Sequence, residues 1–135
     1  MVYLVSSCLM GLVTRYDGQP RPSQECQQFL ADKVWIPICP EQLGGLATPR
    51  PAAEISLGDG RDVLTGVARV VTGQGDVTDA FILGARQVLA VALAQRGGIA
   101  GVCLKGGSPS CGVNRVLGVC AALLAQHGFQ LHEFD

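Results

Sequence analysis

The sequence has little net charge and few charged residues of either sign. Ten Lys and Arg stand against eleven Asp and Glu, so the net charge is −1, and charged residues make up only 16% of the chain. Proteins that bind nucleic acid or an anionic membrane surface carry a basic excess or a basic patch. The charge balance therefore argues against both kinds of partner, including a large RNA substrate.

We expect neither a secretory signal nor a membrane-spanning segment in this sequence. Residues 1–8 have neither the basic region nor the long apolar stretch of an export signal, and their short apolar run suits a strand instead. The most apolar later segment, 80–94, is interrupted by Arg86 and Gln87 and is shorter than the roughly 20 residues that a membrane span needs. We expect a cytoplasmic protein.

The composition that remains is that of a tightly packed globular domain. Hydrophobic residues account for 48% of the 135 residues, and 18 residues are glycine. A chain of this length forms one domain with a single core. A disulfide framework suits small secreted chains that lack a core, so we expect the six cysteines to be reduced thiols.

Strand and helix patterns alternate along the chain. Apolar runs predict strands at 2–7, 34–38, 99–104 and 129–134, and helical patterns cover 24–33, 76–97 and 115–127. Between them, 41–61 predicts a long irregular loop and 63–71 a small strand or hairpin arm, while Pro37 indicates an edge position or a strand end. The fold class predicted is α/β: a single three-layer, Rossmann-like domain, 1–135, with a mostly parallel sheet and helices on both faces.

Three cysteines follow three of the predicted strands. Cys8 comes directly after the first, Cys39 directly after the second, and Cys111 lies in the glycine-rich loop after 99–104. Sites in open α/β sheets form at the carboxyl ends of parallel strands, so these three thiols should meet there. The other three, Cys26, Cys103 and Cys120, fall on helix faces or inside a strand, where cysteine behaves as a small buried hydrophobe.

Three converging thiols suit a soft metal. The candidates are Zn with a fourth ligand or an iron–sulfur cluster with one iron left open, and the alternative is that each cysteine packs separately. His127 and His132 are poor candidates for a fourth ligand, because they lie near the C-terminus, beyond the loops concerned.

Polar residues around the cysteines are candidates for catalysis. The loop 105–112 resembles an anion-binding turn in which Lys105 adds positive charge, and Ser108 and Ser110 could donate hydrogen bonds to sulfur or to a substrate. Glu41, two residues after Cys39, is placed to act as an acid or base. The alternative roles are a simple glycine turn with a solvated lysine, and a helix or turn cap for Glu41.

Several of these segments together resemble the bacterial family called domain of unknown function 523, over nearly the whole chain. The matching segments are Ser6–Gly11, Arg15–Gly18, Cys39–Leu46, Thr48–Arg50, Asp76–Thr78 and Lys105–Gly112. Members of that family include thiouracil desulfidases, which hold a [4Fe-4S] cluster on three cysteines. Some of those desulfidases carry a second acidic residue two positions after the first, where this sequence has Leu43.

The resemblance implies a role for each candidate residue. Cys8, Cys39 and Cys111 would hold the [4Fe-4S] cluster, whose open iron takes sulfur from a thiolated pyrimidine, and Glu41 would assist proton transfer with Lys105, Ser108 and Ser110 nearby. The implied substrate is a small thiolated base or nucleoside, and monomer and dimer both stay open. The competing hypothesis is a non-enzymatic metal-binding or redox-sensing domain that uses the same three cysteines, with Zn as one possible metal.

Overall fold

The computed structural model describes residues 1–135 as two sheets with helices packed around them. In chain order the elements are β1 (Val2–Ser6), the 3₁₀ helix η1 (Ser7–Met10), α1 (Gln24–Leu30), β2 (Trp35–Ile38), α2 (Pro40–Leu43), β3 (Ala53–Ser56), α3 (Gly60–Leu64), β4 (Arg69–Thr72), β5 (Gly75–Asp76), α4 (Thr78–Leu93), β6 (Ile99–Lys105), α5 (Val119–Gln126) and β7 (Leu131–Phe134).

The main sheet is parallel throughout and has the order β2-β1-β6-β7. The chain passes from β1 outward to β2 and then returns to β6 on the other side of β1, so the direction of winding reverses between β1 and β6. Such a reversal leaves a crevice at the carboxyl ends of the two strands, where α/β proteins bind ligands. β2 is an edge strand, as the position of Pro37 predicts.

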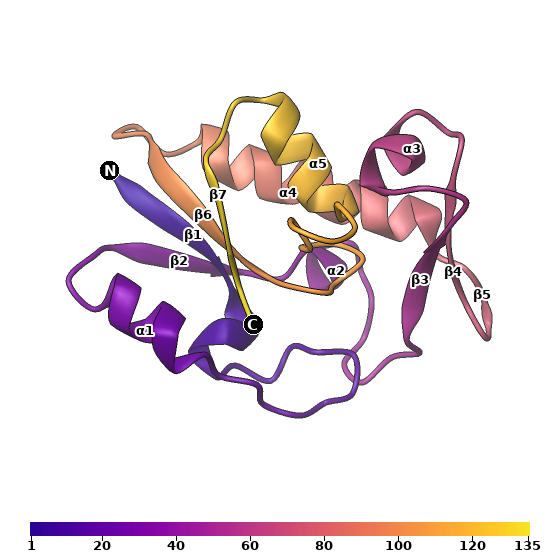
Figure 1. The fold of residues 1–135 in the computed structure, drawn as a ribbon, viewed down its shortest axis with the longest axis horizontal. Coiled ribbons are helices and arrows are strands. Elements are labelled where there is room, and N and C mark those ends of the chain that lie inside the picture. Colours follow the sequence, from indigo (N-terminus) through magenta and orange to yellow (C-terminus); the bar gives the residue numbers. More distant parts are fainter.

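Helices cover both faces of this sheet, which confirms the predicted three-layer α/β class (Figure 1). Alternate residues of β1 face opposite sides: Leu4 joins the larger apolar cluster, with α4 and α5, and Val5 joins a smaller cluster beneath α1. Cys26, Cys103 and Cys120 are fully buried in these clusters, as their apolar spacing predicts. No helix combines the length and apolar character that crossing a membrane requires.

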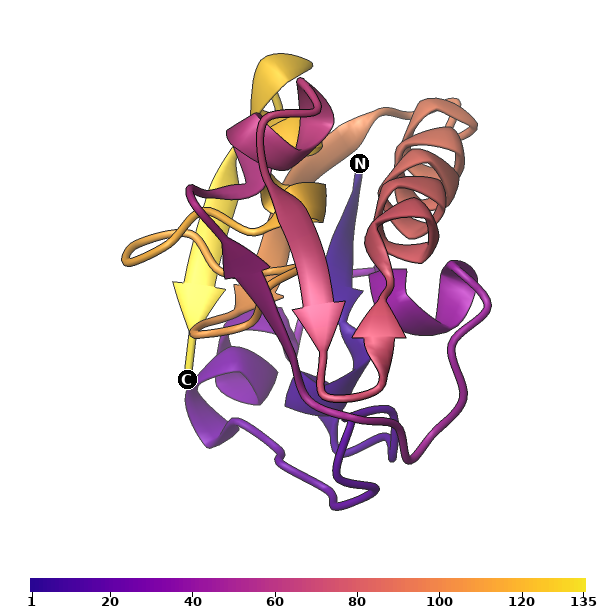
Figure 2. The same cartoon turned by 90° about the vertical axis from the view of Figure 1, so that its right-hand side faces the viewer.

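A second, antiparallel sheet of β3, β4 and β5 lies beside the main one (Figure 2). The prediction of an irregular loop over 41–61 is wrong, since α2, β3 and the start of α3 occupy it. The strand predicted at 63–71 is also shifted: Val63 and Leu64 end α3, and β4 begins at Arg69. A capping box of Asp59 and Asp62 begins α3.

The helix predicted at 115–127 begins later, at Val119. Its first N–H groups bond to loop carbonyls, from Val119 to Pro109 (2.9 Å) and from Cys120 to Ser110 (2.9 Å), so the loop itself caps the helix. Val116, predicted on the inner face, is consequently 53% exposed.

Two glycines let α2 approach α4 backbone to backbone. A Cβ added at Gly84 would lie 1.7 Å from the carbonyl oxygen of Pro40, and one added at Gly44 would lie 2.0 Å from that of Ala80. Because the atoms that would clash belong to the backbone, no side-chain rotation can relieve them. α2 is thereby held at a fixed position at the carboxyl edge of the sheet.

We predict that Gly84→Ala lowers the free energy of unfolding by about 1–3 kcal/mol, the usual range for overpacking. The clash outweighs the gain of about 1 kcal/mol that Ala brings to a helix interior. Gly97→Ala is the matched control, because nothing lies within 4 Å of its added Cβ. Urea denaturation of the two variants measures the difference, and equal midpoints would contradict the close packing described.

Candidate functional site

The three predicted cysteines reach one cavity from three strand ends. β1 runs into η1, which carries Cys8; β2 ends at Ile38, directly before Cys39; and β6 leads into the loop 106–118, which carries Cys111. All three line a cavity of ≈ 250 Å³ at the carboxyl edge of the main sheet. Glu41, Lys105, Ser108 and Ser110 line the same cavity, so all seven candidate residues lie together.

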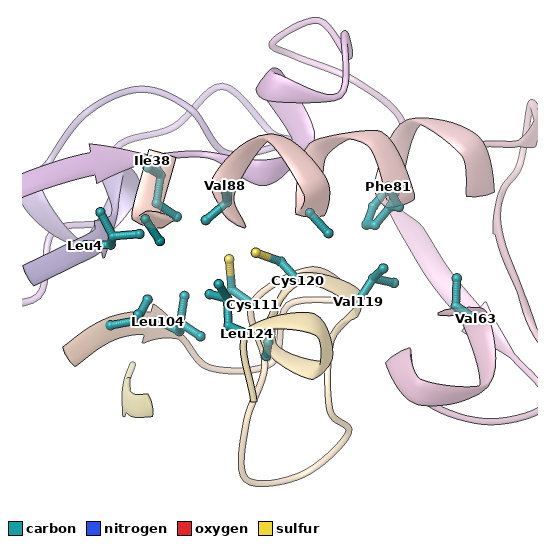
Figure 3. Packing of buried hydrophobic residues seen from close by; sticks show 14 of the residues in the cluster. Leu4, Ile38, Val63, Phe81, Val88, Leu104, Cys111, Val119, Cys120 and Leu124 are labelled. Atoms are coloured by element: carbon teal, nitrogen blue, oxygen red, sulfur yellow. The ribbon is translucent and has the colours of Figure 1, made fainter. Parts of the chain in front are cut away.

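The thiols differ in how deeply they are buried. Cys8 and Cys111 are buried and Cys39 is half-buried, and all six cysteines of the chain are free thiols. Cys111 stands where the cavity meets the apolar core. Figure 3 shows it beside Cys120 among the apolar side chains of the large cluster.

Burial makes the isolated thiolates unfavourable. Burial raises the pKa of the Cys111 thiol to about 12, against the opposing effect of hydrogen bonds from Ser6 and Ser110. Burial and the neighbouring Cys39 raise the pKa of Cys8, which Lys105 and Arg15 partly offset. A group with positive charge that joined the three sulfurs would remove this penalty.

Cys39 is the N-cap residue of α2, and its Sγ donates a hydrogen bond to the carbonyl of Thr14 (3.7 Å). Extended backbone at Cys39 followed by Pro40 at the first helical position begins this short helix. Glu41 follows Pro40 in the same helix. The sequence Cys-Pro-Glu therefore places a thiol and a carboxylate at one mouth of the cavity.

The loop after β6 is shaped by its own serine. Ser108 Oγ accepts hydrogen bonds from the N–H groups of Ser110 (3.2 Å) and Cys111 (3.1 Å). At the other side of the loop, the Glu133 carboxylate of β7 accepts hydrogen bonds from the N–H groups of Val113 (2.8 Å) and Asn114 (3.1 Å). Cys111 is thus held by a loop whose backbone is bonded both internally and to the last strand.

The Glu41 carboxylate is engaged on both oxygens. Arg50 Nε donates to Oε1 (2.9 Å) and the hydroxyl of Ser110 donates to Oε2 (2.9 Å). Ser110 Oγ also lies 3.6 Å from the sulfur of Cys111. Because a hydroxyl carries one proton, Ser110 can donate at one time to the carboxylate or to the sulfur, and its oxygen lies within reach of both.

The other positively charged groups of the cavity are Lys105 and Arg15. Lys105 Nζ donates to the carbonyl of Gly106 (2.9 Å) and forms no ion pair with a carboxylate. Arg15 is paired with Asp17 (2.9 Å). Lys105 thus leaves its positive charge uncompensated beside Cys8.

Sequence reasoning assigned no role to Arg50, although the residue falls in a segment that carries the family resemblance. Its side chain is 6% exposed and lines the cavity. An isolated arginine in a proline-containing loop gives no local sign of its partners. The signal that was available is the position of Arg50 within the motif Thr48-Pro49-Arg50.

The three thiols line a cavity and do not meet at a single point. No group of three His, Cys, Asp or Glu side chains lies close enough together to hold one metal ion. Fold and site together define an α/β domain with a thiol-lined cavity at the switch point of a parallel sheet. α/β domains bind small molecules and cofactors at this position.

Comparison with known proteins identifies the family. Residues 3–134 match the family model described as 2-thiouracil desulfurase, so the chain belongs to the 2-thiouracil desulfurase family. It is 41% identical to the uncharacterized protein YbbK of Bacillus subtilis (strain 168), in an alignment of 141 positions that covers 95% of this chain and 92% of that protein.

A solved structure is also similar. It is that of TudS, a [4Fe-4S]-dependent thiouracil desulfidase, with a TM-score of 0.80 and 38% identity over 99% of this chain and 91% of that one. The predicted resemblance and the predicted α/β class are thereby confirmed.

We predict that Cys39 of the metal-free protein reacts with iodoacetamide about tenfold or more faster than Cys8 and Cys111 at mildly alkaline pH. The thiolate is the reactive form, and raised pKa values keep the Cys8 and Cys111 thiols protonated there. Mass spectrometry of peptides from timed samples measures the order, with the core residue Cys26 as the unreactive control. Faster labelling of Cys111 than of Cys39 would refute the burial described.

Proposed function

We propose that this protein is a [4Fe-4S]-dependent desulfidase that removes sulfur from a thiolated pyrimidine as sulfide. The observation that carries the proposal is the convergence of Cys8, Cys39 and Cys111 on one cavity that also holds the Glu41 carboxylate. Membership of the 2-thiouracil desulfurase family and the likeness to a [4Fe-4S]-dependent desulfidase support it.

The residues present fit an iron–sulfur cluster. Thiolates are the ligands that such clusters prefer. Cys39 lies near enough to raise the pKa of both Cys8 and Cys111, and Cys8 lies near enough to raise that of Cys111. They surround a cavity instead of meeting at one point, which suits a group of several metal atoms better than a single zinc ion. With three ligands, a bound cluster would supply an iron with an open coordination position that takes the sulfur of a thiocarbonyl group.

The chain's own residues supply the acid–base chemistry. The net reaction exchanges C=S and water for C=O and hydrogen sulfide, so the attacking water must lose a proton at the ring carbon. We assign the acceptance of that proton to Glu41, whose carboxylate lines the cavity and is held there by Ser110 and Arg50. The same group can then return a proton to the departing sulfur.

The remaining candidates support the ligands. Ser110 links the carboxylate to the sulfur of Cys111, so it would couple the proton-transfer group to the ligand set. Lys105 would offset negative charge near Cys8, on which it acts to lower the pKa. Ser108 would hold the loop that presents Cys111.

Anaerobic reconstitution with iron and sulfide should give a brown protein with about four iron atoms per chain. Cys8→Ala, Cys39→Ala and Cys111→Ala should each lose most of the iron and all sulfide release from a thiouracil. Cys26→Ala, which removes a buried thiol from the far face of the sheet, should retain both. Zinc without iron, and no turnover of thiolated bases, would favour a metal-binding or redox-sensing domain instead.

Glu41→Gln should lower kcat for thiouracil by about 10²- to 10⁴-fold, the usual contribution of a general acid or base, without loss of iron. The exposed α1 residue Glu25 provides the control, since Glu25→Gln removes the same charge far from the cavity. Steady-state assays of sulfide release, with iron determination on the same samples, make the comparison. An unchanged kcat in Glu41→Gln would mean that another group accepts the proton from the attacking water.

A further inference from the structure

Arg50 lies between two cavities. Glu41, Arg50 and Ala53 line both the thiol-bearing cavity and a second one of ≈ 230 Å³ that extends beneath the small sheet to Asp76 and Phe81. The Arg50 side chain is nevertheless only 6% exposed. A buried positive charge at such a boundary needs a partner, and its partner is the candidate catalytic carboxylate.

Each nitrogen of the guanidinium has a partner within the protein. Nε donates to Glu41 Oε1 (2.9 Å), Nη1 donates to the carbonyl of Ala47 (3.1 Å) and to Thr48 Oγ1 (2.9 Å), and Nη2 donates to the carbonyl of Thr14 (2.8 Å). The backbone N–H of Arg50 also donates to the carbonyl of Tyr16 (2.8 Å). Four of the guanidinium's five N–H donors are engaged in this way, so Arg50 is suited to hold other residues in place.

The groups that Arg50 joins come from two parts of the site. The carbonyl of Thr14 also accepts the hydrogen bond from the Cys39 thiol (3.7 Å), so one oxygen lies between the guanidinium and a proposed cluster ligand. The second oxygen of the Glu41 carboxylate accepts a hydrogen bond from the hydroxyl of Ser110. Arg50 therefore fixes the carboxylate from the side opposite to Ser110.

We propose that Arg50 is a positioning residue for the desulfidase reaction: it holds the Glu41 carboxylate in the orientation that directs Oε2 to Ser110 and the cavity. This inference rests on the proposed function of Glu41. Without the guanidinium, Glu41 could rotate about its side-chain torsions into either cavity, because both border it.

Lysine cannot take over this role. The guanidinium is a planar fork whose nitrogens point in fixed directions, and here it serves the carboxylate, two carbonyls and a hydroxyl at once. A single ammonium on a flexible stem can neutralise Glu41 without fixing its orientation. Arg50→Lys thus keeps the positive charge at this position and removes the directed hydrogen bonds of the guanidinium.

The test is a double-mutant cycle on the reconstituted enzyme. Arg50→Gln and Arg50→Lys should each lower kcat for thiouracil, Arg50→Gln by about 100-fold, with KM and iron content changed little. In a Glu41→Gln background, adding Arg50→Gln should change kcat by no more than about twofold, because the residue acts through the carboxylate already removed. The double variant also removes both charges of the buried pair, so it avoids leaving one charge unpaired if the single variant folds poorly.

Arg61→Gln is the matched control, since it breaks an ion pair of the same kind at an exposed position. A second readout needs no cluster: a crystal structure of metal-free Arg50→Lys should show the Glu41 carboxylate turned away from Ser110.

The role of Arg50 would be overturned by losses that multiply in the double variant, by wild-type kcat in Arg50→Lys, or by an unmoved Glu41 in that crystal structure. Loss of iron in Arg50→Gln would assign the residue to cluster retention and would equally overturn the proposal. Iron-loaded wild-type enzyme that releases no sulfide would refute the desulfidase itself, an outcome distinct from these.

Discussion

The parallel alignment of the strands is the constraint on which the site depends. Parallel strands end at one edge of a sheet, so residues that follow β1, β2 and β6 come together although they are far apart in the chain. The reversal of winding between β1 and β6 opens a crevice at that edge. Cys8 and Cys111 stand on either side of the crevice, and α2, pressed against α4 through Gly44 and Gly84, brings Cys39 and Glu41 to it.

Electrostatics explains why these side chains form one unit. Buried thiols resist ionisation, and three thiolates would repel one another, so these three cysteines are stable as thiolates only with a positive centre among them. Glu41 adds a further negative charge at the same mouth. The buried ion pair with Arg50 compensates that charge, and the hydroxyl of Ser110 supplies a hydrogen bond without charge.

The parts of the fold that local pattern determines were predictable. Apolar runs located the four strands of the main sheet, and the residue after each strand end could be placed at one edge without knowing any contact. Of the small sheet only β4 was anticipated, as the shifted strand at 63–71, whereas α2, α3 and β3 could not be found in this way. Residues 41–61 have no apolar period, and tertiary contacts stabilise their structure, such as the close approach of Gly44 to Ala80. The role of Arg50 could not be predicted for the same reason, because one of its acceptors, the carbonyl of Thr14, lies 36 residues away in the chain.

The bond between Glu133 and the loop that carries Cys111 bears on the order in which the molecule is built. Val113 and Asn114 reach the Glu133 carboxylate only when β7 has paired with β6, and β7 is the last of these elements to leave the ribosome. Until then the loop that carries Cys111 lacks this bond to the sheet and is held by its internal hydrogen bonds and its bonds to α5. The last strand of the domain thus completes the support of the loop that presents the third thiol.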